Sequence, residues 1–384
     1  MISKLKTSIK LTIYALINFF IKPSKKTKPK SLLLIRLDAI GDYVLFRNFI
    51  AELKKSEKYK NYSITLLGNS AWKSISEELD SEFIDKFIWI DRNKFNKNIV
   101  YRYKKLQEIV SDGYELVLSP VYSREFLVSD AIVKLVSAEE KIGSIGDLSN
   151  IRKWQKRISD KYYTRLIPAK DEIMFEFYRN KEFFENLLNT RLDIKKPHIE
   201  LRKKKIHFKL PENNYAILFI GATDSYRKWG MENFAKVAKY LNERYGYEIV
   251  VCGGPGDIKD VEEFERYFEG NFTNLVGKTS LVELLFVIYN GNLMISNETS
   301  APHLAVALEM TNIFVISNGN HYGRFTPYPK EMTSSYHVIY HPEIEKDLDN
   351  YKKLSNSYGY GSTLDINDIS VESVINKIEG ILNV

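Results

Sequence analysis

Cysteine is nearly absent from this chain, because Cys252 is the only one among 384 residues. A single cysteine excludes a disulfide framework and a cysteine-based zinc site, and it fits a reducing compartment. Hydrophobic residues make up 44% and charged residues 27%, a globular composition without a long segment typical of disorder. The length exceeds that of one ordinary core, so we expect two domains.

A long apolar run is also missing near the N-terminus. Residues 11–21 read LTIYALINFFI, which is shorter than the roughly 20 apolar residues that a bilayer span needs. Lys22-Pro23 follows, in place of the small residues of a secretory cleavage site. Helical spacing puts six apolar residues on one face: Leu5, Ile9, Ile13, Leu16, Ile17 and Phe20. We expect a helix in the interface of an anionic membrane, or else a terminal helix that docks on its own protein.

Acidic residues are absent from the first 30 positions. That segment carries eight lysines: Lys4, Lys6, Lys10, Lys22, Lys25, Lys26, Lys28 and Lys30. Their charge exceeds the formal net charge of +7 by one, so the rest of the chain carries −1. The basic excess therefore belongs to the tail, which argues against a nucleic-acid-binding groove in the folded body.

The glycine-bearing turns contain neither the G-x-G-x-x-G fingerprint nor a P-loop, which argues against a dinucleotide dehydrogenase and an ATPase. What is present is an alternation of short apolar strands with amphipathic helices, which predicts parallel sheets with crossovers. In the first half, strands are expected at 32–37, 63–67, 86–90 and 115–118, with helices from Asp42 and at 99–110. Residues 140–170 have no clean periodicity.

A second alternation begins after a polar, basic stretch at 195–211, which we interpret as an inter-domain linker that includes Arg202 to Lys205. Strands are expected at 216–220, 248–252, 293–296 and 313–316, and helices at 231–245, 281–289, 302–308 and 371–382. Ser280 and Glu283 fit a capping box. The expected divisions are a tail (1–30), a first Rossmann-like domain (31–205), a second (206–365) and a C-terminal helix (366–384).

Three strands of the second half end in turns of small or polar residues, at 221–223, 253–256 and 297–300. The carboxyl ends of parallel strands share one edge, where open α/β sheets bind ligands, and helix N-termini there suit a diphosphate. Arg227 and Lys228 could add charge-assisted contacts. The alternative is that the glycines only make tight turns.

Two further residues have a structural and a functional interpretation. Asp42, at a helix start after the first strand, is either an N-cap or a general base, and Asp38 competes with it for the second role. His303, one turn into its helix, is either a core histidine or a donor to a phosphate or ribose.

Five ordered segments together resemble glycosyltransferase family 9, the heptosyltransferase family. They are Arg36-Leu37-Asp38-Ala39-Ile40-Gly41-Asp42, the stretch from Gly221 to Phe234, Gly253-Gly254-Pro255-Gly256-Asp257, Val276-Gly277-Lys278-Thr279-Ser280-Leu281, and Asn297-Glu298-Thr299-Ser300-Ala301-Pro302-His303-Leu304. The resemblance covers about residues 32–50 and 215–327.

The resemblance implies an α/β GT-B fold, in which two Rossmann-like domains face each other across a cleft. The first would bind the acceptor and the second the nucleotide sugar, with inversion at the anomeric carbon, no cofactor and no obligatory metal. Asp42 takes the position of the catalytic base. The positions expected to bind the donor are Thr223, Arg227, Lys228, Gly254, Thr279, Glu298, Thr299, Ser300 and His303.

Three of these positions depart from the family pattern. Arg227 stands where lysine is usual, Glu298 where many members have aspartate, and Ser300 where glycine is common. Glutamate reaches further than aspartate, and a side chain at Ser300 narrows a place where backbone approaches the ligand. The departures at Glu298 and Ser300 leave open whether the donor is ADP-heptose, the family's best-known donor, or another nucleotide sugar.

The sequence thus predicts an inverting transfer of heptose or another hexose-like sugar from a nucleotide-diphosphate sugar. The acceptor would be a lipopolysaccharide core or another glycolipid or oligosaccharide, reached at the cytoplasmic face of the inner membrane by a peripherally bound enzyme. The rival hypotheses are a non-catalytic nucleotide- or sugar-binding protein and a nucleic-acid-binding protein. A GT-A type of enzyme would need Asp347 and Asp349 as a metal-binding pair, but their polar surroundings predict a surface position.

Overall fold

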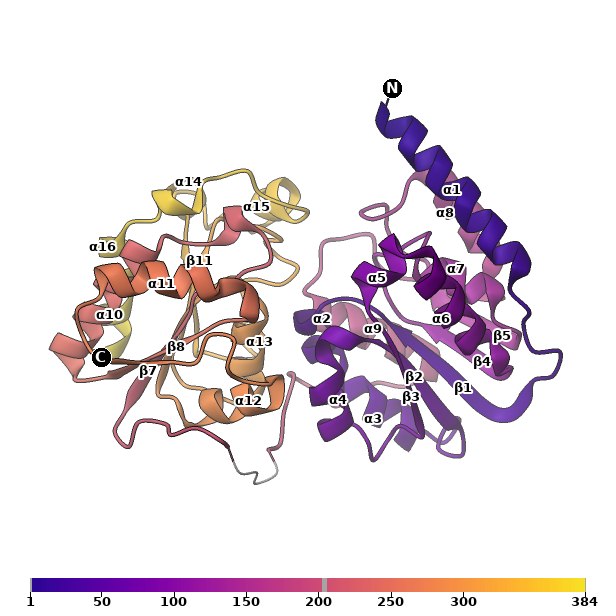
Figure 1. Cartoon of the computed structure of the whole chain (residues 1–384), viewed down its shortest axis with the longest axis horizontal. Coiled ribbons are helices and arrows are strands. Elements are labelled where there is room, and N and C mark those ends of the chain that lie inside the picture. Colours follow the sequence, from indigo (N-terminus) through magenta and orange to yellow (C-terminus); the bar gives the residue numbers. More distant parts are fainter. Residues whose placement is uncertain (1, 202–205, 384) are drawn as a thin grey trace. The chain divides into compact units, whose positions relative to one another are not determined.

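A computed structural model describes residues 2–201 and 206–383, so the linker residues Arg202 to Lys205 lie outside the described part (Figure 1). The described residues form two compact units. The first unit comprises Met1–Lys170 and Arg179–Leu192, and the second comprises Asp171–Tyr178 and Asp193–Val384. Each unit has its own six-stranded parallel sheet.

The first sheet has the strand order β3-β2-β1-β4-β5-β6. Its strands are β1 (Lys28–Arg36), β2 (Ser63–Asn69), β3 (Lys86–Ile90), β4 (Tyr114–Ser119), β5 (Ala138–Ser144) and β6 (Arg165–Ile167). The four predicted strands are confirmed. The strands β5 and β6 were not predicted, because the first half of β5 is polar and partly exposed and β6 has only three residues.

The helices of the first unit are α1 (Ile2–Phe20), α2 (Ile40–Phe46), α3 (Asn48–Lys55), α4 (Lys73–Leu79), α5 (Arg92–Lys97), α6 (Ile99–Ser111), α7 (Ser129–Leu135) and α8 (Lys153–Ser159). α9 (Glu176–Leu188) begins in residues of the second unit and continues into the first. Leu33 and Ile35 of β1 pack in one core cluster with side chains of α5, α6 and α7. Their neighbours Leu32 and Leu34 are equally buried, as expected for a central parallel strand that is covered on both faces.

The N-terminal helix α1 docks on the first unit by one face. Tyr14, Ile17 and Ile21 are buried in the same core cluster, and Tyr14 Oη donates to the carbonyl oxygen of Asn96 at 2.8 Å. The Arg102 guanidinium lies 3.8 Å from the centre of the Tyr14 ring. The expected alternative of docking on its own protein is therefore confirmed for this face.

The predicted apolar face of this helix needs correction. Ile17 belongs to the docked face, whereas Leu16 and Phe20 are exposed together with Phe19, the most exposed of them at 81%. The reason is that apolar residues follow each other so closely here that they occupy more than one side of the helix. Within the described residues, no helix combines the length and the apolar character that crossing a bilayer requires.

The second sheet has the strand order β12-β11-β10-β7-β8-β9. Its strands are β7 (Tyr215–Phe219), β8 (Glu248–Cys252), β9 (Phe272–Asn274), β10 (Leu293–Asn297), β11 (Ile313–Ser317) and β12 (Tyr336–Tyr340). Its helices are α10 (Met231–Tyr245), α11 (Ile258–Tyr267), α12 (Leu281–Asn290), α13 (Ser300–Ala307), α14 (Pro342–Glu345), α15 (Tyr351–Tyr358) and α16 (Val371–Leu382). The four predicted strands are confirmed, and the two unpredicted ones, β9 and β12, are the edges.

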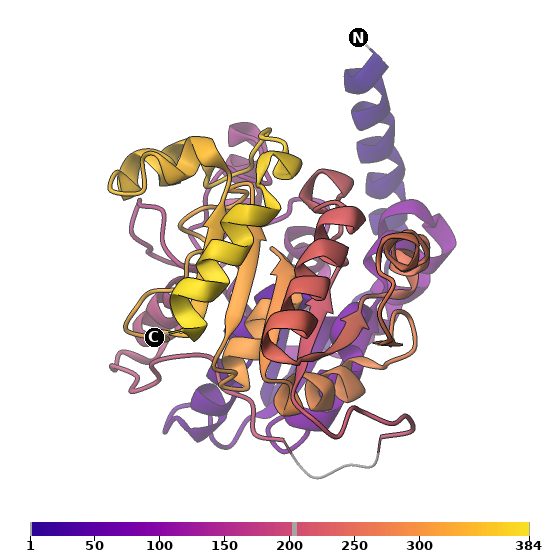
Figure 2. The same ribbon diagram turned by 90° about the vertical axis from the view of Figure 1, so that its left-hand side faces the viewer.

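One face of the second sheet is covered by α10 and α16, which lie side by side in Figure 2. Val374 and Ile378 of α16 are fully buried in the core cluster of this unit, so the C-terminal helix is part of the second unit. The segment before the linker also follows this unit, because the Ile199 amide donates to the Ala307 carbonyl oxygen at 2.8 Å. The predicted capping box of Ser280 and Glu283 begins α12.

Candidate functional site

The three polar turns of the second half lie at one edge of the second sheet. They follow β7, β8 and β10, which are neighbours in the order β10-β7-β8 and run parallel. Their carboxyl ends therefore meet at one edge, as predicted, and this is where open α/β sheets bind ligands.

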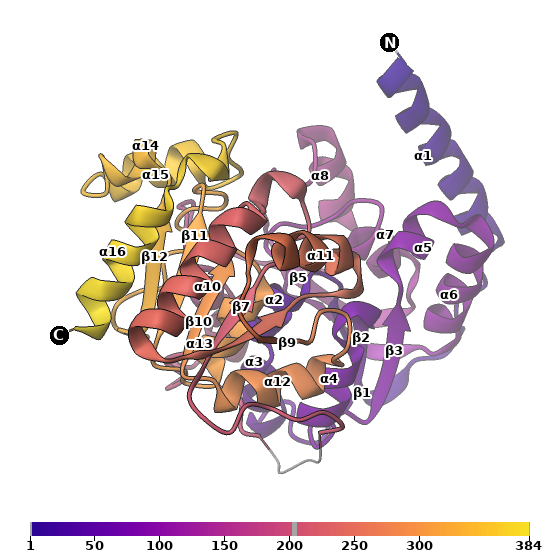
Figure 3. The ribbon, with the colours of Figure 1, turned by 60° about the vertical axis from the view of Figure 1, so that its left-hand side comes forward.

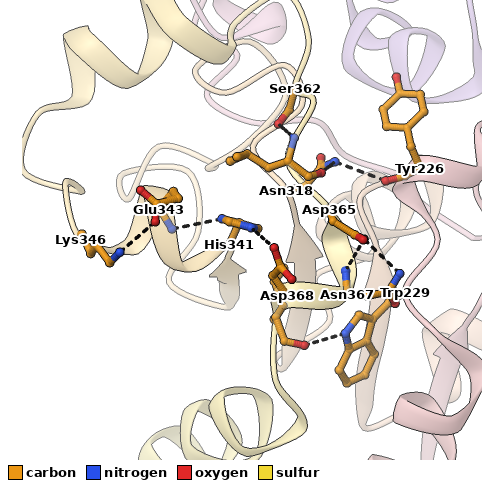
Figure 4. A network of polar contacts seen from close by, with 12 residues as sticks. Tyr226, Trp229, Asn318, His341, Glu343, Lys346, Ser362, Asp365, Asn367 and Asp368 are labelled. Atoms are coloured by element: carbon orange, nitrogen blue, oxygen red, sulfur yellow. Dashed lines mark hydrogen bonds and ion pairs between the residues drawn. The ribbon is translucent and has the colours of Figure 1, made fainter.

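Asn297, the last residue of β10, fixes the loop at 221–229. Its side-chain amide donates to the Ile220 carbonyl oxygen at 2.7 Å and accepts from the Trp229 amide at 3.0 Å. Asn318 supports the same loop by donating to the carbonyl oxygens of Tyr226, at 3.3 Å, and Leu364, at 2.9 Å (Figure 4). The loop that carries Thr223, Arg227 and Lys228 is thus held by polar contacts from the ends of two strands.

Arg227 and Glu298 form the charged centre of this edge. Arg227 donates through Nη2 to the backbone carbonyl oxygen of Glu298, and the same nitrogen lies 3.6 Å from the Glu298 carboxylate. The Ser317 hydroxyl donates to the other carboxylate oxygen. Burial raises the pKa of Glu298, and the nearby Arg227 charge and the Ser317 hydrogen bond oppose that rise. Arg227 Nε and Glu298 Oε1 are both buried without a hydrogen-bond partner, so both retain capacity for a polar ligand.

The N-terminus of α13 lies directly after Glu298. Thr299 takes the N-cap position in an extended conformation, and among the described residues no side chain caps this helix. The first N–H groups of an uncapped helix are free to donate and carry a partial positive charge, which favours an anion. Thr299 and Ser300 are half-buried there. The Arg227 guanidinium and the start of α13 are therefore brought together at a place that suits a diphosphate.

His303 is buried one turn into α13, and its Nδ1 lies 2.8 Å from the Tyr328 hydroxyl. Burial, aided by the Arg227 charge, lowers the pKa of His303 to about 3, so the ring is neutral at pH 7. The burial and the contact of Nδ1 with Tyr328 agree with the interpretation of His303 as a core histidine. A role of the ring in donor binding stays a prediction.

The pKa of His303 predicts a loss of stability in acid. The folded pKa is about 3 and the ordinary value is about 6.5. Between these two pH values His303 binds a proton in the unfolded chain but not in the folded chain. Stability is therefore lost as the pH falls from about 6.5 towards 3. One such proton changes the free energy of unfolding by about 1.4 kcal/mol per pH unit. Urea unfolding at pH 7 and pH 5 measures this slope. His303→Gln should lose about one proton's share of it, and an unchanged acid slope in that variant would contradict the assignment.

Lys228 turns away from Arg227. Its ammonium lies 2.7 Å from Asp257 and 2.5 Å from Asp260, and these carboxylates raise its pKa against the effect of burial. Asp257 in turn accepts from the Gly254 amide at 2.8 Å, and a Cβ at Gly221 would clash with its carboxylate. Lys228 and Gly254 thus hold the glycine turns together, and their contact with a donor remains a prediction.

Thr279 is half-buried just before Ser280, the N-cap of α12.

The candidate base Asp42 lies near the start of α2. α2 begins at Ile40, earlier than expected, with Ala39 at the N-cap. Asp42 is therefore not an N-cap residue. It occupies the third helical position, and its carboxylate reaches back to accept from the Ala39 amide at 3.2 Å, which is why the helix begins earlier.

Asp42 and its competitor Asp38 have different surroundings in the structure. Arg36, completely buried, donates through Nε to the Asp38 carboxylate at 2.8 Å from one oxygen and 2.9 Å from the other. Arg36 is itself held by Asn180, at 2.8 Å. The Asp38 carboxylate therefore neutralises a buried cation, whereas Asp42 is half-buried at the start of α2.

Sequence reasoning missed a fourth strand end. Asn318 and Asn320 follow β11, the neighbour of β10 in the sheet. The Asn320 side chain is buried, and both of its polar atoms lack a hydrogen-bond partner. Burial lowers the pKa of the adjacent His321 to about 4, with smaller effects from Arg324 and Arg227. The sequence contains a signal for this strand end, because the polar run Ser317-Asn318-Gly319-Asn320-His321 directly follows the predicted strand at 313–316.

The described part of the chain shows no metal-binding cluster. Across residues 2–201 and 206–383, no three or more His, Cys, Asp or Glu side chains come together in a way that would hold a metal ion. Asp347 accepts from Lys353 at 2.5 Å, and Asp349 is exposed. These two acids lie on the surface of the second unit, as the polar surroundings predict.

Two sequence comparisons both match heptosyltransferases. A family model described as "Glycosyltransferase family 9 (heptosyltransferase)" matches residues 102–354. The chain is 26% identical over 234 residues to "Lipopolysaccharide heptosyltransferase 3" of Escherichia coli (strain K12), a match that covers 59% of this chain and 64% of that protein. The chain thus spans slightly less than two thirds of the length of this curated relative.

Solved structures share the fold. The glycosyltransferase family 9 protein from Veillonella parvula has a TM-score of 0.68 at 20% identity, covering 94% of this chain and 99% of that one. E. coli ADP-heptose lps heptosyltransferase II has a TM-score of 0.64 at 16% identity, covering 92% and 98%. E. coli heptosyltransferase WaaC with ADP-2-deoxy-2-fluoro heptose has a TM-score of 0.62 at 16% identity, covering 91% and 99%. The predicted α/β fold of the GT-B type is confirmed.

Proposed function

Since this chain belongs to glycosyltransferase family 9, the heptosyltransferase family, we propose that it transfers heptose or a closely related sugar, with inversion, from a nucleoside-diphosphate sugar to a lipopolysaccharide core or another surface glycan. The observation that carries the proposal is the pairing of Arg227 with Glu298 at the uncapped start of α13. The names of the relatives, which include a structure with an ADP-heptose analogue, support ADP-heptose as the first donor to test.

The departing diphosphate would be stabilised by the second unit. Its charge increases as the bond to the anomeric carbon breaks, and fixed donors aimed at that charge lower the barrier. Arg227 provides a cation that Glu298, itself bound by the Ser317 hydroxyl, already holds in place, and the first N–H groups of α13 add their partial positive charge. Thr223, Thr299 and Ser300 border the same turns, and we propose them as further donor contacts.

The acceptor hydroxyl would be deprotonated by Asp42 as its oxygen attacks the anomeric carbon. A carboxylate is a suitable general base, and that of Asp42 lies on a short strand–helix junction. There it accepts a hydrogen bond from the backbone amide of Ala39. Asp38 is less suited, because its charge is needed by the buried Arg36. We therefore retain Asp42 as the base.

Ligand-induced stabilisation tests this function. A nucleoside diphosphate or nucleotide sugar at a hundred times its dissociation constant should add about 2.7 kcal/mol to the free energy of unfolding. We expect ADP and ADP-heptose to stabilise the purified protein in a thermal-shift series that includes UDP, GDP and their sugars. Stabilisation by a different base would change the donor but keep the site, whereas no response to the whole series would contradict the proposal.

We further propose that the protein associates peripherally with an anionic membrane through α1. Leu16, Phe19 and Phe20 are exposed on this helix at 58%, 81% and 62%, in a segment whose charges are all lysines. Exposed aromatic and aliphatic side chains with flanking lysines are typical of interfacial helices.

Polar substitution of this exposed face provides the test. Deleting residues 1–29 would also remove the buried Tyr14, Ile17 and Ile21 and the start of β1. Changing Leu16, Phe19 and Phe20 to serine instead spares the core. Because burying each such side chain contributes about 1.5–3 kcal/mol at full burial, we expect partitioning onto phosphatidylglycerol-containing vesicles to fall by more than about tenfold.

The matched control for this experiment is Tyr267→Ser with Tyr289→Ser, since both tyrosines are comparably exposed on the second unit. This pair of changes should leave partitioning unchanged. If the wild-type protein ignores such vesicles at low salt, or if the triple serine variant binds them as well as the wild type, α1 is not the anchor.

A further inference from the structure

An apolar groove lies within the first unit and is lined by side chains of α1, α7 and α8. Its volume is about 490 Å³, within the roughly 300–1,000 Å³ typical of small-molecule sites. The residues that line it are Leu11, Tyr14, Ala15, Asn18, Phe19, Phe126, Leu127, Ala131, Lys134, Leu135, Trp154 and Tyr162. The proposed transfer reaction uses none of them.

Aromatic side chains form both walls of the groove. Trp154 on α8 packs edge-on against Phe126 with ring centres 5.6 Å apart, yet it remains 43% exposed. Phe19 on α1 lines the same groove and is almost fully exposed. An open apolar hollow with exposed aromatic residues on its rim marks a place where an apolar ligand or surface binds.

The charges around this groove are predominantly positive. α8 reads Lys-Trp-Gln-Lys-Arg-Ile-Ser and contains no acid, and its Lys153 and Arg157 are exposed. The acid that follows it, Asp160, is paired with Arg124 and with Lys156, the latter at 3.1 Å. Lys134 lies on the groove itself, with its ammonium 5.4 Å from the Tyr162 ring centre. The complementary partner is therefore apolar in the groove and anionic at the rim.

We propose that this groove binds an acyl chain of an anionic membrane lipid, so that α8 joins α1 as a second membrane-contacting helix. The inference rests on the membrane association proposed above. A second copy of the chain fits less well, since it would place one basic rim against another. Each basic residue near an anionic surface contributes about 1 kcal/mol, and amphipathic side chains such as tryptophan suit the boundary between headgroups and acyl chains.

Tryptophan quenching by brominated lipids tests the position of the acyl chain. Trp72 and Trp229 are fully buried and Trp89 is half-buried, so Trp154 is the most exposed of the four. Full-length protein is mixed with vesicles of phosphatidylglycerol that is brominated along the acyl chains. We expect its fluorescence to be quenched, and most of the quenching to disappear in Trp154→Phe, which conserves the aromatic packing against Phe126. Quenching that persists unchanged in Trp154→Phe would overturn the proposal.

A charge variant gives a second, independent readout. Lys153→Gln with Arg157→Gln should lower partitioning onto phosphatidylglycerol vesicles about thirty-fold, by the two charges removed. The control Lys58→Gln with Lys60→Gln removes two lysines that follow α3, away from α8 (Figures 1 and 3), and should have no such effect. A change in sedimentation instead of in vesicle binding would show that a second copy occupies the groove and would overturn the lipid assignment.

The groove proposal can fail while attachment through α1 and the transferase function still hold. If wild-type protein binds the vesicles but the Trp154 and Lys153–Arg157 variants behave like it, the groove assignment fails and attachment through α1 stands. If wild-type protein does not bind them, both membrane proposals fail. Thermal stabilisation by ADP, measured on every variant, reports on the second unit and tests the transferase function alone.

Discussion

Asp42→Asn is expected to lower sugar transfer by about 10²–10⁴-fold, the usual contribution of a general base, while nucleotide affinity and stability stay nearly unchanged. The amide oxygen of the substituted side chain can still accept from the Ala39 amide, as the Asp42 carboxylate does at 3.2 Å, so the start of α2 is preserved. The substituted amide cannot accept the proton of the acceptor hydroxyl. Initial rates at saturating donor and acceptor, together with a urea unfolding curve, measure both effects.

Asp38→Asn serves as the comparison variant. It removes the negative charge beside the buried Arg36, and removing one partner of a buried ion pair is destabilising. We therefore expect a loss of stability with transfer retained in the folded protein. If Asp42→Asn transfers sugar at nearly the wild-type rate while Asp38→Asn does not, Asp38 is the base and the assignment is wrong.

Arg227→Ala is expected to weaken binding of the nucleoside diphosphate by about 1.5–3 kcal/mol, which is the range of a hydrogen bond to a charged group. This corresponds to a loss of affinity of about 10- to 150-fold. Isothermal titration with ADP measures it. The loop should remain folded, because Asn297 and Asn318 hold it independently of Arg227.

Two substitutions sharpen this experiment. Arg227→Lys restores the residue that is usual in the family and should recover most of the affinity. Lys228→Ala is the matched control, because Lys228 is paired with Asp257 and Asp260, and we expect it to reduce stability more than affinity. Unchanged ADP binding in Arg227→Ala, or a nucleotide-bound structure with the diphosphate far from the Gly221 and Ser300 turns, would contradict the placement of the donor.

The sequence was sufficient to predict the strands that carry the site. Central parallel strands are buried on both faces and therefore appear as short apolar runs, as at Leu32 to Leu37. Three of the four missed strands, β6, β9 and β12, lie at sheet edges, where a strand needs less burial, and the fourth, β5, lies next to the edge strand β6. β9 has only three half-buried residues, and charged residues interrupt the first half of β5.

The partners of charged side chains could not be predicted. Arg227 and Lys228 are adjacent in sequence and equally basic, but one contacts Glu298 and the other Asp257 and Asp260. Adjacent residues in a short 3₁₀ turn point in different directions, and only the tertiary structure determines which acids they meet. The side of α1 that docks was unpredictable for a similar reason, since apolar residues lie on more than one side.

Glu298 illustrates how the structure accommodates a departure from the family pattern. Its side chain, longer than aspartate, extends from the end of β10 to the Ser317 hydroxyl at the end of β11. The extra reach is therefore used within the sheet edge, and the second carboxylate oxygen stays near Arg227. We therefore expect the departure at Glu298 to leave donor binding intact, and Ser300 becomes the first position to test for donor choice.

The central claim is that this chain transfers a sugar from a nucleotide donor, and acceptor-dependent release of nucleoside diphosphate measures it most directly. Purified full-length protein is incubated with ADP-heptose, with and without heptose-deficient lipopolysaccharide acceptor, and the release of ADP is followed. We predict release that requires the acceptor, accompanies a mass gain of one sugar on it, and falls by about 10²–10⁴-fold in Asp42→Asn. Tight nucleotide binding without release, for ADP-heptose and for a panel of other nucleotide sugars, would show a binding protein instead of a transferase.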